Sequence, residues 1–229
     1  MKHVNGPLIT VITVTYNAVS SIEATIQSVI NRVNNNIQFI IIDGGSTDGT
    51  IDIINKYKNQ ITYFVSEPDS GLYDAMNKGW KVANEFSYIL YLGSGDKIIS
   101  FPHNDSFAKA GIIAGVVSIG NKFLYEPKID IRLKLGNTLH HQALLIKKSL
   151  HPLPPFDITF KIYADFDFNQ RLLKAGYKII IDESFKAYAM EGGVSSSFNE
   201  TESLEIVKKN YGWFYHKFAQ LYYLLRHEI

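Results

Sequence analysis

The sequence contains no cysteine, and this absence excludes several kinds of chemistry. A disulfide framework, a thiolate nucleophile and zinc held by cysteine are all ruled out. A chain without disulfides fits a reducing cytoplasm, which is where we expect this protein to be.

The sequence also lacks long apolar runs and an excess of charge of either sign. Its N-terminal apolar run, Leu8 to Val14, is far shorter than the roughly 18 residues of a membrane span. Because this run contains threonine and leads into a turn, we interpret it as a strand rather than a signal peptide. The net charge of +1 gives no general attraction for polyanions, so nucleic acid is not an expected partner.

The most informative stretch, Phe39 to Thr50, reads FIIIDGGSTDGT. Its first four residues are apolar and β-rich, which predicts a strand buried on both faces, as in a parallel sheet. Asp43 ends this run. Ser46 and Asp48 then favour the start of a helix. A carboxylate therefore lies at the carboxyl end of a strand, the edge at which open α/β sheets bind ligands.

The glycines of this stretch do not form a known phosphate-binding loop. Gly44, Gly45 and Gly49 match neither the dinucleotide fingerprint nor a Walker loop, which argues against an oxidoreductase with a dinucleotide cofactor. Asp43 and Asp48 would repel bare phosphate, whereas a carboxylate suits a ribose hydroxyl or the N–H of a pyrimidine. A helix-capping turn without any ligand remains the alternative.

Strands and helices alternate over the first hundred residues, which predicts a parallel, doubly wound α/β sheet. The predicted strands are Leu8–Thr15, Phe39–Ile42, Ile61–Val65 and Tyr88–Leu92. The first predicted helix is capped by Ser20 or Ser21, the second starts after Ser46, Thr47 and Asp48, and the third spans Gly71–Asn84. Three of the strands end at polar residues, and these clusters should converge on one rim of the sheet.

The second half of the chain is less regular. Gly120–Asn121 is a hairpin signal between two predicted strands. The predicted strands here are Ile112–Ile119, Lys122–Tyr125, Leu144–Ile146, Tyr177–Ile181 and Phe185–Met190, and the predicted helices are Tyr163–Ala175 and Glu202–His227.

Seven motifs together resemble the family 2 glycosyltransferases of the GT-A fold, in particular bacterial enzymes that build O-antigen, colanic acid or capsular polysaccharide. They are TVTYNA (13–18), IIDGGSTDGT (41–50), SGLYDAMNKG (70–79), YLGSGD (91–96), HHQA (140–143), ADFDF (164–168) and GGVS (192–195). The resemblance implies a Rossmann-like, mostly parallel sheet flanked by helices, with a C-terminal acceptor-side region and a helical tail. It implies one domain, 1–229, made of a nucleotide-sugar-binding half (1–100), an acceptor-side half (101–200) and a C-terminal helical segment (201–229).

The activity implied by this resemblance is inverting transfer of a sugar from a nucleotide-diphosphate sugar, expected to be a UDP-sugar, to a hydroxyl of a glycan acceptor. The expected acceptor is lipid-linked, in surface polysaccharide biosynthesis. A nucleotidyltransferase would normally need a basic loop after the first strand, and TYNAVSSIE contains no Lys or Arg. A non-catalytic module that binds nucleotide sugars remains an alternative.

The donor would be held, by resemblance and by position at the rim, by residues from four motifs. They are Thr15, Tyr16, Asn17, Asp43, Asp74, Lys78, Ser94, Gly95 and Asp96. The alternative for Tyr16 is an aromatic residue of the core, and the alternative for Lys78 is a solvated surface charge.

The resemblance also implies a divalent cation, Mg²⁺ or Mn²⁺, which hard oxygen ligands favour. Here the sequence departs from the family, because Gly93 and Gly95 replace the usual aspartates and leave Asp96 as the only carboxylate of the loop. Asp96 is therefore the predicted metal ligand, and a turn residue that caps its own backbone is the alternative.

Asp165 matches the family's catalytic aspartate and would act as the base that accepts the proton of the attacking hydroxyl. The Glu that usually precedes it is Ala164 here. Asp167 is the rival, and two residues this close on a helix point to nearly opposite faces, so only one can face the acceptor. Both could instead serve only to stabilise the start of a helix.

Four further residues match family positions near the acceptor or the diphosphate. His141 and Gln142 would lie near the acceptor, with a purely structural histidine as the alternative. Gly193 and Ser195 would belong to a mobile loop that closes over the diphosphate, with a plain connector as the alternative.

The C-terminal segment is strongly aromatic and carries several basic residues. This combination suits the membrane interface and would allow peripheral contact with the cytoplasmic face of the inner membrane. Packing in the core or a dimer contact is the alternative.

Overall fold

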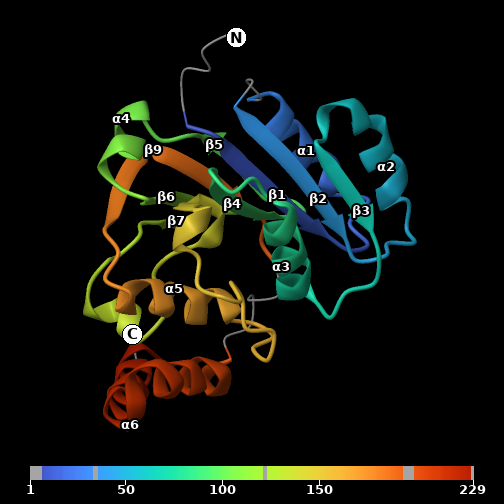
Figure 1. Ribbon diagram of the computed structural model, residues 1–229. Coiled ribbons are helices and arrows are strands. Elements are labelled where there is room, and N and C mark those ends of the chain that lie inside the picture. Colours follow the sequence, from blue (N-terminus) through green and yellow to red (C-terminus); the bar gives the residue numbers. More distant parts are fainter. Residues whose placement is uncertain (1–6, 33–35, 121–122, 193–198, 228–229) are drawn as a thin grey trace.

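A computed structural model describes residues 7–32, 36–120, 123–192 and 199–227. Within these residues a nine-stranded sheet runs in the order β3-β2-β1-β4-β8-β6-β9-β5, and β7 pairs with β6 (Figure 1). The strands are β1 (Ile9–Thr15), β2 (Ile37–Asp43), β3 (Tyr63–Ser66), β4 (Tyr88–Gly93), β5 (Lys97–Ser100), β6 (Ile112–Ile119), β7 (Phe123–Tyr125), β8 (Leu144–Lys147) and β9 (Ile179–Ala189). The helices are α1 (Ile22–Ile30), α2 (Thr50–Lys56), α3 (Leu72–Val82), α4 (Asn104–Lys109), α5 (Ala164–Lys174) and α6 (Glu200–His227).

The first half of the chain forms the parallel part of the sheet, as predicted. Strands β3, β2, β1 and β4 are mutually parallel, with β1 between β2 and β4. Every residue of β1 is buried, as expected for a strand covered by helices on both faces. All predicted elements of this half occur, and the ends of the four strands and of α3 lie within two residues of the predicted ones.

The second half adds antiparallel strands and differs from the prediction in detail. Strand β8 is antiparallel to both β4 and β6, whereas β9 is parallel to β6. The two strands predicted between Tyr177 and Met190 form one strand, β9, interrupted by a bulge in which Asp182 accepts hydrogen bonds from Ser184 N (2.9 Å) and Oγ (2.5 Å). Strand β5 and helix α4 were not predicted.

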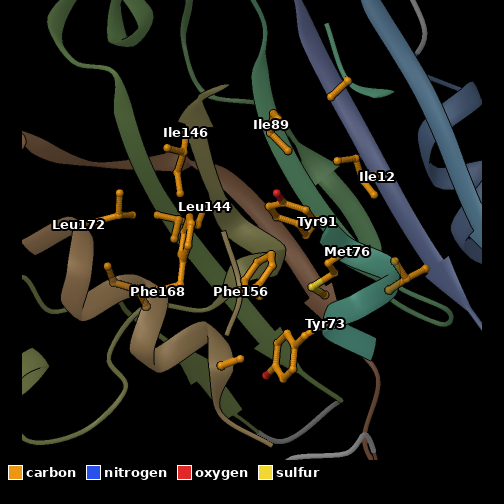
Figure 2. Packing of buried hydrophobic residues seen from close by; sticks show 14 of the residues in the cluster. Ile12, Tyr73, Met76, Ile89, Tyr91, Leu144, Ile146, Phe156, Phe168 and Leu172 are labelled. Carbon is orange, nitrogen blue, oxygen red and sulfur yellow. The ribbon is translucent and has the colours of Figure 1, made fainter. Parts of the chain in front are cut away.

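Two hydrophobic clusters cover the two faces of the sheet, and β1 contributes to both because its side chains alternate. Ile12 lies in the cluster shown in Figure 2, where Tyr73, Tyr91 and Phe156 pack between the sheet, α3 and α5. Val11 belongs to the opposite cluster, which includes residues of α1 and α2.

Helix α6 packs against α5 at the end of the molecule furthest from α2 (Figure 1). Gly212 interrupts it with φ 82°, a conformation that favours glycine, so α6 consists of two helical parts. A third cluster joins these parts to α5 and to the short helix at Ile131–Lys134. In the part of the chain that is described, no helix combines the length and the apolar character needed to cross a membrane.

Candidate active site

The ends of β1 and β2 form one unit at the rim of the sheet. Thr15 and Asp43 are partners in the parallel register, and the N–H of Gly44 donates to the carbonyl oxygen of Thr15 (2.9 Å). Asn17 joins the loops from both sides: its N–H donates to Ser46 Oγ (2.7 Å), and its Oδ1 accepts from the N–H of Thr47 (2.9 Å). The first two predicted polar clusters are therefore brought together.

Asp43 is completely buried, and its carboxylate is engaged within its own loop. Its Oδ2 accepts from the N–H groups of Gly45 (3.0 Å) and Ser46 (2.8 Å) and from Ser66 Oγ (2.6 Å). Its Oδ1 accepts from Ser46 Oγ (2.5 Å). These contacts show that Asp43 shapes the loop, and contact with a nucleoside stays a prediction.

Tyr16 is 64% exposed, so the alternative of a core aromatic residue is wrong. Its ring lies beside Gly44, where an added Cβ would stand 3.3 Å from Tyr16 Cδ2 and 2.6 Å from Asp69 Oδ2. The sequence analysis did not select Asp69. Its position in the loop after β3 could have marked it as a rim residue, because Asp43 lies in a similar place at the end of β2.

Asp74 and Lys78 lie on α3 and bind the segment that connects β3 to α3. Lys78 Nζ contacts Glu67 (2.9 Å), the carbonyl oxygen of Pro68 (2.8 Å) and, more distantly, Asp74 (3.9 Å). The hydrogen bond to Glu67 is the main cause that raises the pKa of Lys78 above its ordinary value. Asp74 accepts from the N–H of Ser70 (3.0 Å), so both residues fix the rim beside Asp69.

The turn after β4 carries Ser94, Gly95 and Asp96. Ser94 Oγ lies 3.4 Å from the carbonyl oxygen of Val14, which links this turn to β1. Gly95 has φ +98°, which strains other residues, and a Cβ there would stand 2.5 Å from Met190 Sδ and displace that side chain.

Asp96 is only 6% exposed and accepts hydrogen bonds from neutral groups. The donors are the N–H groups of Gly93 (2.9 Å) and Met190 (3.0 Å) and the side-chain amide of Gln142 (3.2 Å). Burial raises the pKa of Asp96, an effect that His141 and these hydrogen bonds oppose.

These surroundings fit a cation at Asp96, because a buried carboxylate with only neutral donors gains from a positive charge. Among the described residues no group of three or more His, Cys, Asp or Glu could hold a metal by itself. The protein would therefore supply one ligand, and oxygens of a bound diphosphate and water would supply the others.

Asp165 lies in the first turn of α5, and its side chain is 13% exposed. Its Oδ2 accepts from Asn137 Nδ2 (3.1 Å) and lies 3.4 Å from His141 Nδ1. Its Oδ1 accepts from the N–H of Phe166 (2.9 Å) and lies 3.2 Å from Tyr73 Oη, whose hydroxyl donates to the carbonyl oxygen of Ile162 (2.7 Å). Burial, followed by the charge of Asp165, raises the pKa of Tyr73 well above 10, so this hydroxyl remains a donor.

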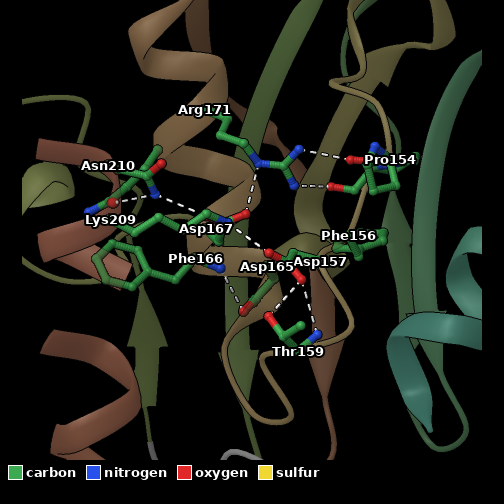
Figure 3. Close-up of polar contacts among 12 residues, drawn as sticks. Pro154, Phe156, Asp157, Thr159, Asp165, Phe166, Asp167, Arg171, Lys209 and Asn210 are labelled. Carbon is green, nitrogen blue, oxygen red and sulfur yellow. Dashed lines mark hydrogen bonds and ion pairs between the residues drawn. The ribbon is translucent and has the colours of Figure 1, made fainter. Parts of the chain in front are cut away.

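Asp167 faces the opposite way, towards α6, as Figure 3 shows. It is completely buried and contacts Arg171 Nε (2.8 Å), Lys209 Nζ (2.9 Å) and Asn210 Nδ2 (3.0 Å). Asp167 therefore holds α5 to α6, and of the two aspartates only Asp165 contacts the HHQA segment.

The HHQA segment connects the two candidate carboxylates. His141 contacts Asp165 and its neighbour Gln142 donates to Asp96, so consecutive residues join the turn after β4 to the start of α5. His140 is different: burial lowers its pKa to about 4, and its ring packs edge-on against Tyr125, with the centroids 4.2 Å apart. Gly193 and Ser195, the predicted loop residues, lie outside the described residues.

Comparisons with known proteins agree with this architecture. Residues 10–95 match the model of glycosyl transferase family 2. The PGL/p-HBAD biosynthesis glycosyltransferase of Mycobacterium tuberculosis is 26% identical over 87% of this chain and 84% of its own length. The putative teichuronic acid biosynthesis glycosyltransferase TuaG of Bacillus subtilis is 39% identical over 40% of this chain and 37% of its own length.

Two solved structures share the fold at low sequence identity. S. aureus TarS 1-349 in complex with UDP has a TM-score of 0.61 at 19% identity and covers 88% of this chain and 70% of its own. The mannosyltransferase PcManGT from Pyrobaculum calidifontis, in complex with GDP-Man and Mn²⁺, has a TM-score of 0.63 at 16% identity, covering 90% of this chain and 64% of its own.

The sheet and these neighbours show the GT-A fold, and the similar sequences show that the chain is a glycosyltransferase. Over residues 10–95 the chain is similar to glycosyltransferase family 2, and the relatives it resembles are named for PGL/p-HBAD and teichuronic acid biosynthesis.

Proposed function

We propose that the chain acts as a single domain that transfers a sugar, with inversion, from a UDP-sugar to a hydroxyl of a lipid-linked glycan acceptor. One observation carries this proposal: His141 and Gln142 bring the carboxylates of Asp165 and Asp96 to one place, although they come from distant segments. The printed names of relatives in PGL/p-HBAD and teichuronic acid biosynthesis support a role in building cell-surface glycans.

The donor would bind across the rim formed by the ends of β1, β2, β3 and β4. The exposed ring of Tyr16 could stack on the nucleobase of the donor, and the carboxylate of Asp69 lies beside this ring. Thr15, Asn17 and Asp43 would contact the nucleoside or support its loop. Asp74, Lys78, Ser94 and Gly95 would line the path towards the sugar and diphosphate.

Asp96 would hold a divalent cation, Mg²⁺ or Mn²⁺, which when bound neutralises charge on the leaving diphosphate. The Mn²⁺ in the PcManGT complex supports this assignment. Hydrogen bonds from the N–H of Met190 and the side-chain amide of Gln142 fix the position of the Asp96 carboxylate.

Asp165 would accept the proton of the acceptor hydroxyl as that oxygen attacks the anomeric carbon. The bond from this carbon to the diphosphate oxygen breaks at the opposite face, so the configuration inverts and UDP leaves. Asn137, Tyr73 and His141 fix the carboxylate that receives the proton. A base of this kind contributes typically about 10²–10⁴-fold to the rate.

The test is product formation from a panel of nucleotide sugars with a synthetic lipid-diphosphate sugar acceptor. We expect turnover with a UDP-sugar, and an α-linked donor of the D series should give a β-linked product by its NMR coupling constant. A retained configuration would contradict Asp165 as a base for direct displacement. Donor binding without any product over the full panel would favour the binding-module alternative for this chain.

The metal assignment has a test of its own. UDP binding should tighten when Mn²⁺ is added, and Asp96→Ala should remove this enhancement in calorimetry. Full turnover after exhaustive chelation would show that the reaction needs no metal.

A further inference from the structure

The C-terminal part of α6 has an apolar face that no described residue covers. With about 100° per residue, one arc roughly 140° wide contains seven residues of this helix. We call it the outer arc, and it consists of Trp213, Phe214, Lys217, Phe218, Leu221, Leu224 and Leu225. All seven are exposed, and each of the six apolar side chains is more than half exposed.

The opposite face of this helix already makes the contacts that hold it to the protein. Ala219 and Tyr223 are buried in the third cluster, and Tyr223 Oη lies 2.7 Å from Ser203 Oγ. His216 Nδ1 donates to the carbonyl oxygen of Leu204 (3.1 Å). The outer arc is therefore additional apolar surface that folding of α6 does not need.

Charge is distributed unevenly along α6. Its first part carries Glu200, Glu202 and Glu205, but the sequence has no Asp or Glu from there until Glu228. The same interval contains three Lys and one Arg, in a protein whose net charge is only +1. Lys217 belongs to the outer arc itself and lies over the ring of Trp213, 6.0 Å from its centroid.

We propose that the outer arc is a membrane-docking surface that binds anionic lipid, with this part of α6 lying in the plane of the interface. Aromatic and leucine side chains would enter the boundary between headgroups and acyl chains, and the basic residues would meet lipid phosphates. A second copy of this chain is a poorer partner, because a symmetric contact would bring Lys217 near its own copy with no Asp or Glu on the arc to pair with it. The charge bias therefore selects an anionic surface.

Docking would act on the active site through direct contacts. The carboxylate of Glu202 accepts from the N–H groups of Ile162 (2.8 Å) and Tyr163 (2.6 Å), just before α5. Lys209 binds Asp167 on α5 itself. Because α5 carries Asp165, a docked α6 would hold the base at a fixed distance from the lipid surface.

The experiment is flotation of the full-length protein with phosphatidylcholine vesicles that contain or lack phosphatidylglycerol. No donor or turnover is needed, so the outcome is independent of the proposed reaction. We expect binding to the anionic vesicles that weakens at high salt. The triple variant Phe214→Ser, Leu221→Ser, Leu224→Ser should bind anionic vesicles at least about tenfold more weakly than the wild type. Lys217→Glu should lose about tenfold on anionic vesicles only.

Matched controls change the same residue types elsewhere. The variant Phe86→Ser, Leu124→Ser, Leu153→Ser removes three exposed apolar side chains outside α6, and Lys58→Glu reverses an exposed charge near α2. Both controls should bind as the wild type does, and melting curves should show all variants folded. The proposal is overturned if the wild-type protein does not bind anionic vesicles. It is equally overturned if the control variants lose as much binding as the outer-arc variants. It is also overturned if sedimentation shows a dimer that the outer-arc variant abolishes while no vesicle binding occurs.

Discussion

Asp165 and Asp167 are two residues apart on α5, yet one faces the HHQA segment and the other faces α6. Asp165 is partly exposed and held by neutral donors, so it is available to accept a proton. Asp167 is completely buried and pairs with a lysine and an arginine, so its charge stabilises the packing of α5 against α6. The same residue type is therefore available for the proposed chemistry at one position and stabilises the fold at the other.

Conservative variants of this pair should give opposite results. Asp165→Asn should reduce turnover by about 10²–10⁴-fold and leave UDP affinity and the melting temperature near wild type. Asp167→Asn should lower the free energy of unfolding by about 1.5–3 kcal/mol, because it removes the buried charge that Arg171 and Lys209 contact, while the folded fraction remains active. Turnover assays and urea titrations measure both. Collapse of turnover only in Asp167→Asn would mean that the base is assigned to the wrong carboxylate.

Tyr16 offers a direct probe of the donor site because its side chain is exposed and its removal should not disturb the fold. Tyr16→Ala should weaken UDP binding by about 1–3 kcal/mol, as expected for loss of base–aromatic stacking. Tyr16→Phe keeps the ring and should bind UDP like the wild type. Calorimetry at constant Mn²⁺ measures both; equal affinity of all three proteins would remove Tyr16 from the site.

Asp43 and Asp69 show what the sequence could and could not predict about the site. The position of Asp43 at a strand end follows from the apolar run before it, and the structure confirms that position. Its hydrogen bonds depend on Ser66, which is distant in sequence and becomes a neighbour only when β2 and β3 pair. Asp69 was missed because its proximity to Tyr16 and Gly44 likewise depends on tertiary contacts.

At the scale of elements, α6 supports the end of α5 that carries the candidate base. Glu202 of α6 caps three N–H groups, those of Lys161 (3.1 Å), Ile162 (2.8 Å) and Tyr163 (2.6 Å), in the segment that leads into α5. These backbone N–H groups lie outside any helix or strand ladder and therefore need acceptors from side chains or water. The position of Asp165 therefore depends on a residue far from it in sequence.

Glu202→Ala should lower the free energy of unfolding by about 1.5–3 kcal/mol through loss of hydrogen bonds to a charged group. It should also reduce kcat, because the start of α5 loses its support, while KM for the donor stays close to wild type. Glu205→Ala removes an exposed carboxylate from the same helix and is the matched control. If Glu202→Ala lowers stability but leaves kcat unchanged, α6 has no positioning role.

Elements with strong local patterns were the ones that the sequence predicted well. The buried run of β1 and the 3–4 spacing of α1 carry their own signals. Strand β5 has only four residues, and its partner β9 lies more than eighty residues away, so its pairing is a tertiary effect. Helix α4 has six residues and no apolar period long enough to detect.

At the scale of the whole molecule, one sheet joins both halves, and its core contains a histidine that, together with His140, should make the protein less stable in acid. His151 is buried and packs near Trp80, Tyr91 and Phe168. Its Nδ1–H donates to the carbonyl oxygen of Lys147 (3.1 Å), and its Nε2 has no partner among the described residues. A second proton would therefore enter apolar surroundings, and burial lowers the pKa of His151 to about 4.

The direction of the pH effect follows from this lowered pKa. Above about pH 6.5 the histidine is neutral in both the folded and the unfolded chain. Between about 6.5 and 4 the unfolded chain binds a proton that the folded protein does not, so stability falls as the pH falls. The difference between the two pKa values corresponds to a loss in the free energy of unfolding on the order of 3 kcal/mol over that window. Melting curves from pH 7.5 to 5 should therefore show a steady loss of stability.

His151→Asn, which can keep the hydrogen bond to Lys147, should be less stable than the wild type at pH 7.5 but should lose less stability on acidification. His103→Asn, at an exposed histidine, controls for the loss of a histidine, and equal pH slopes in all three proteins would contradict the assignment to His151.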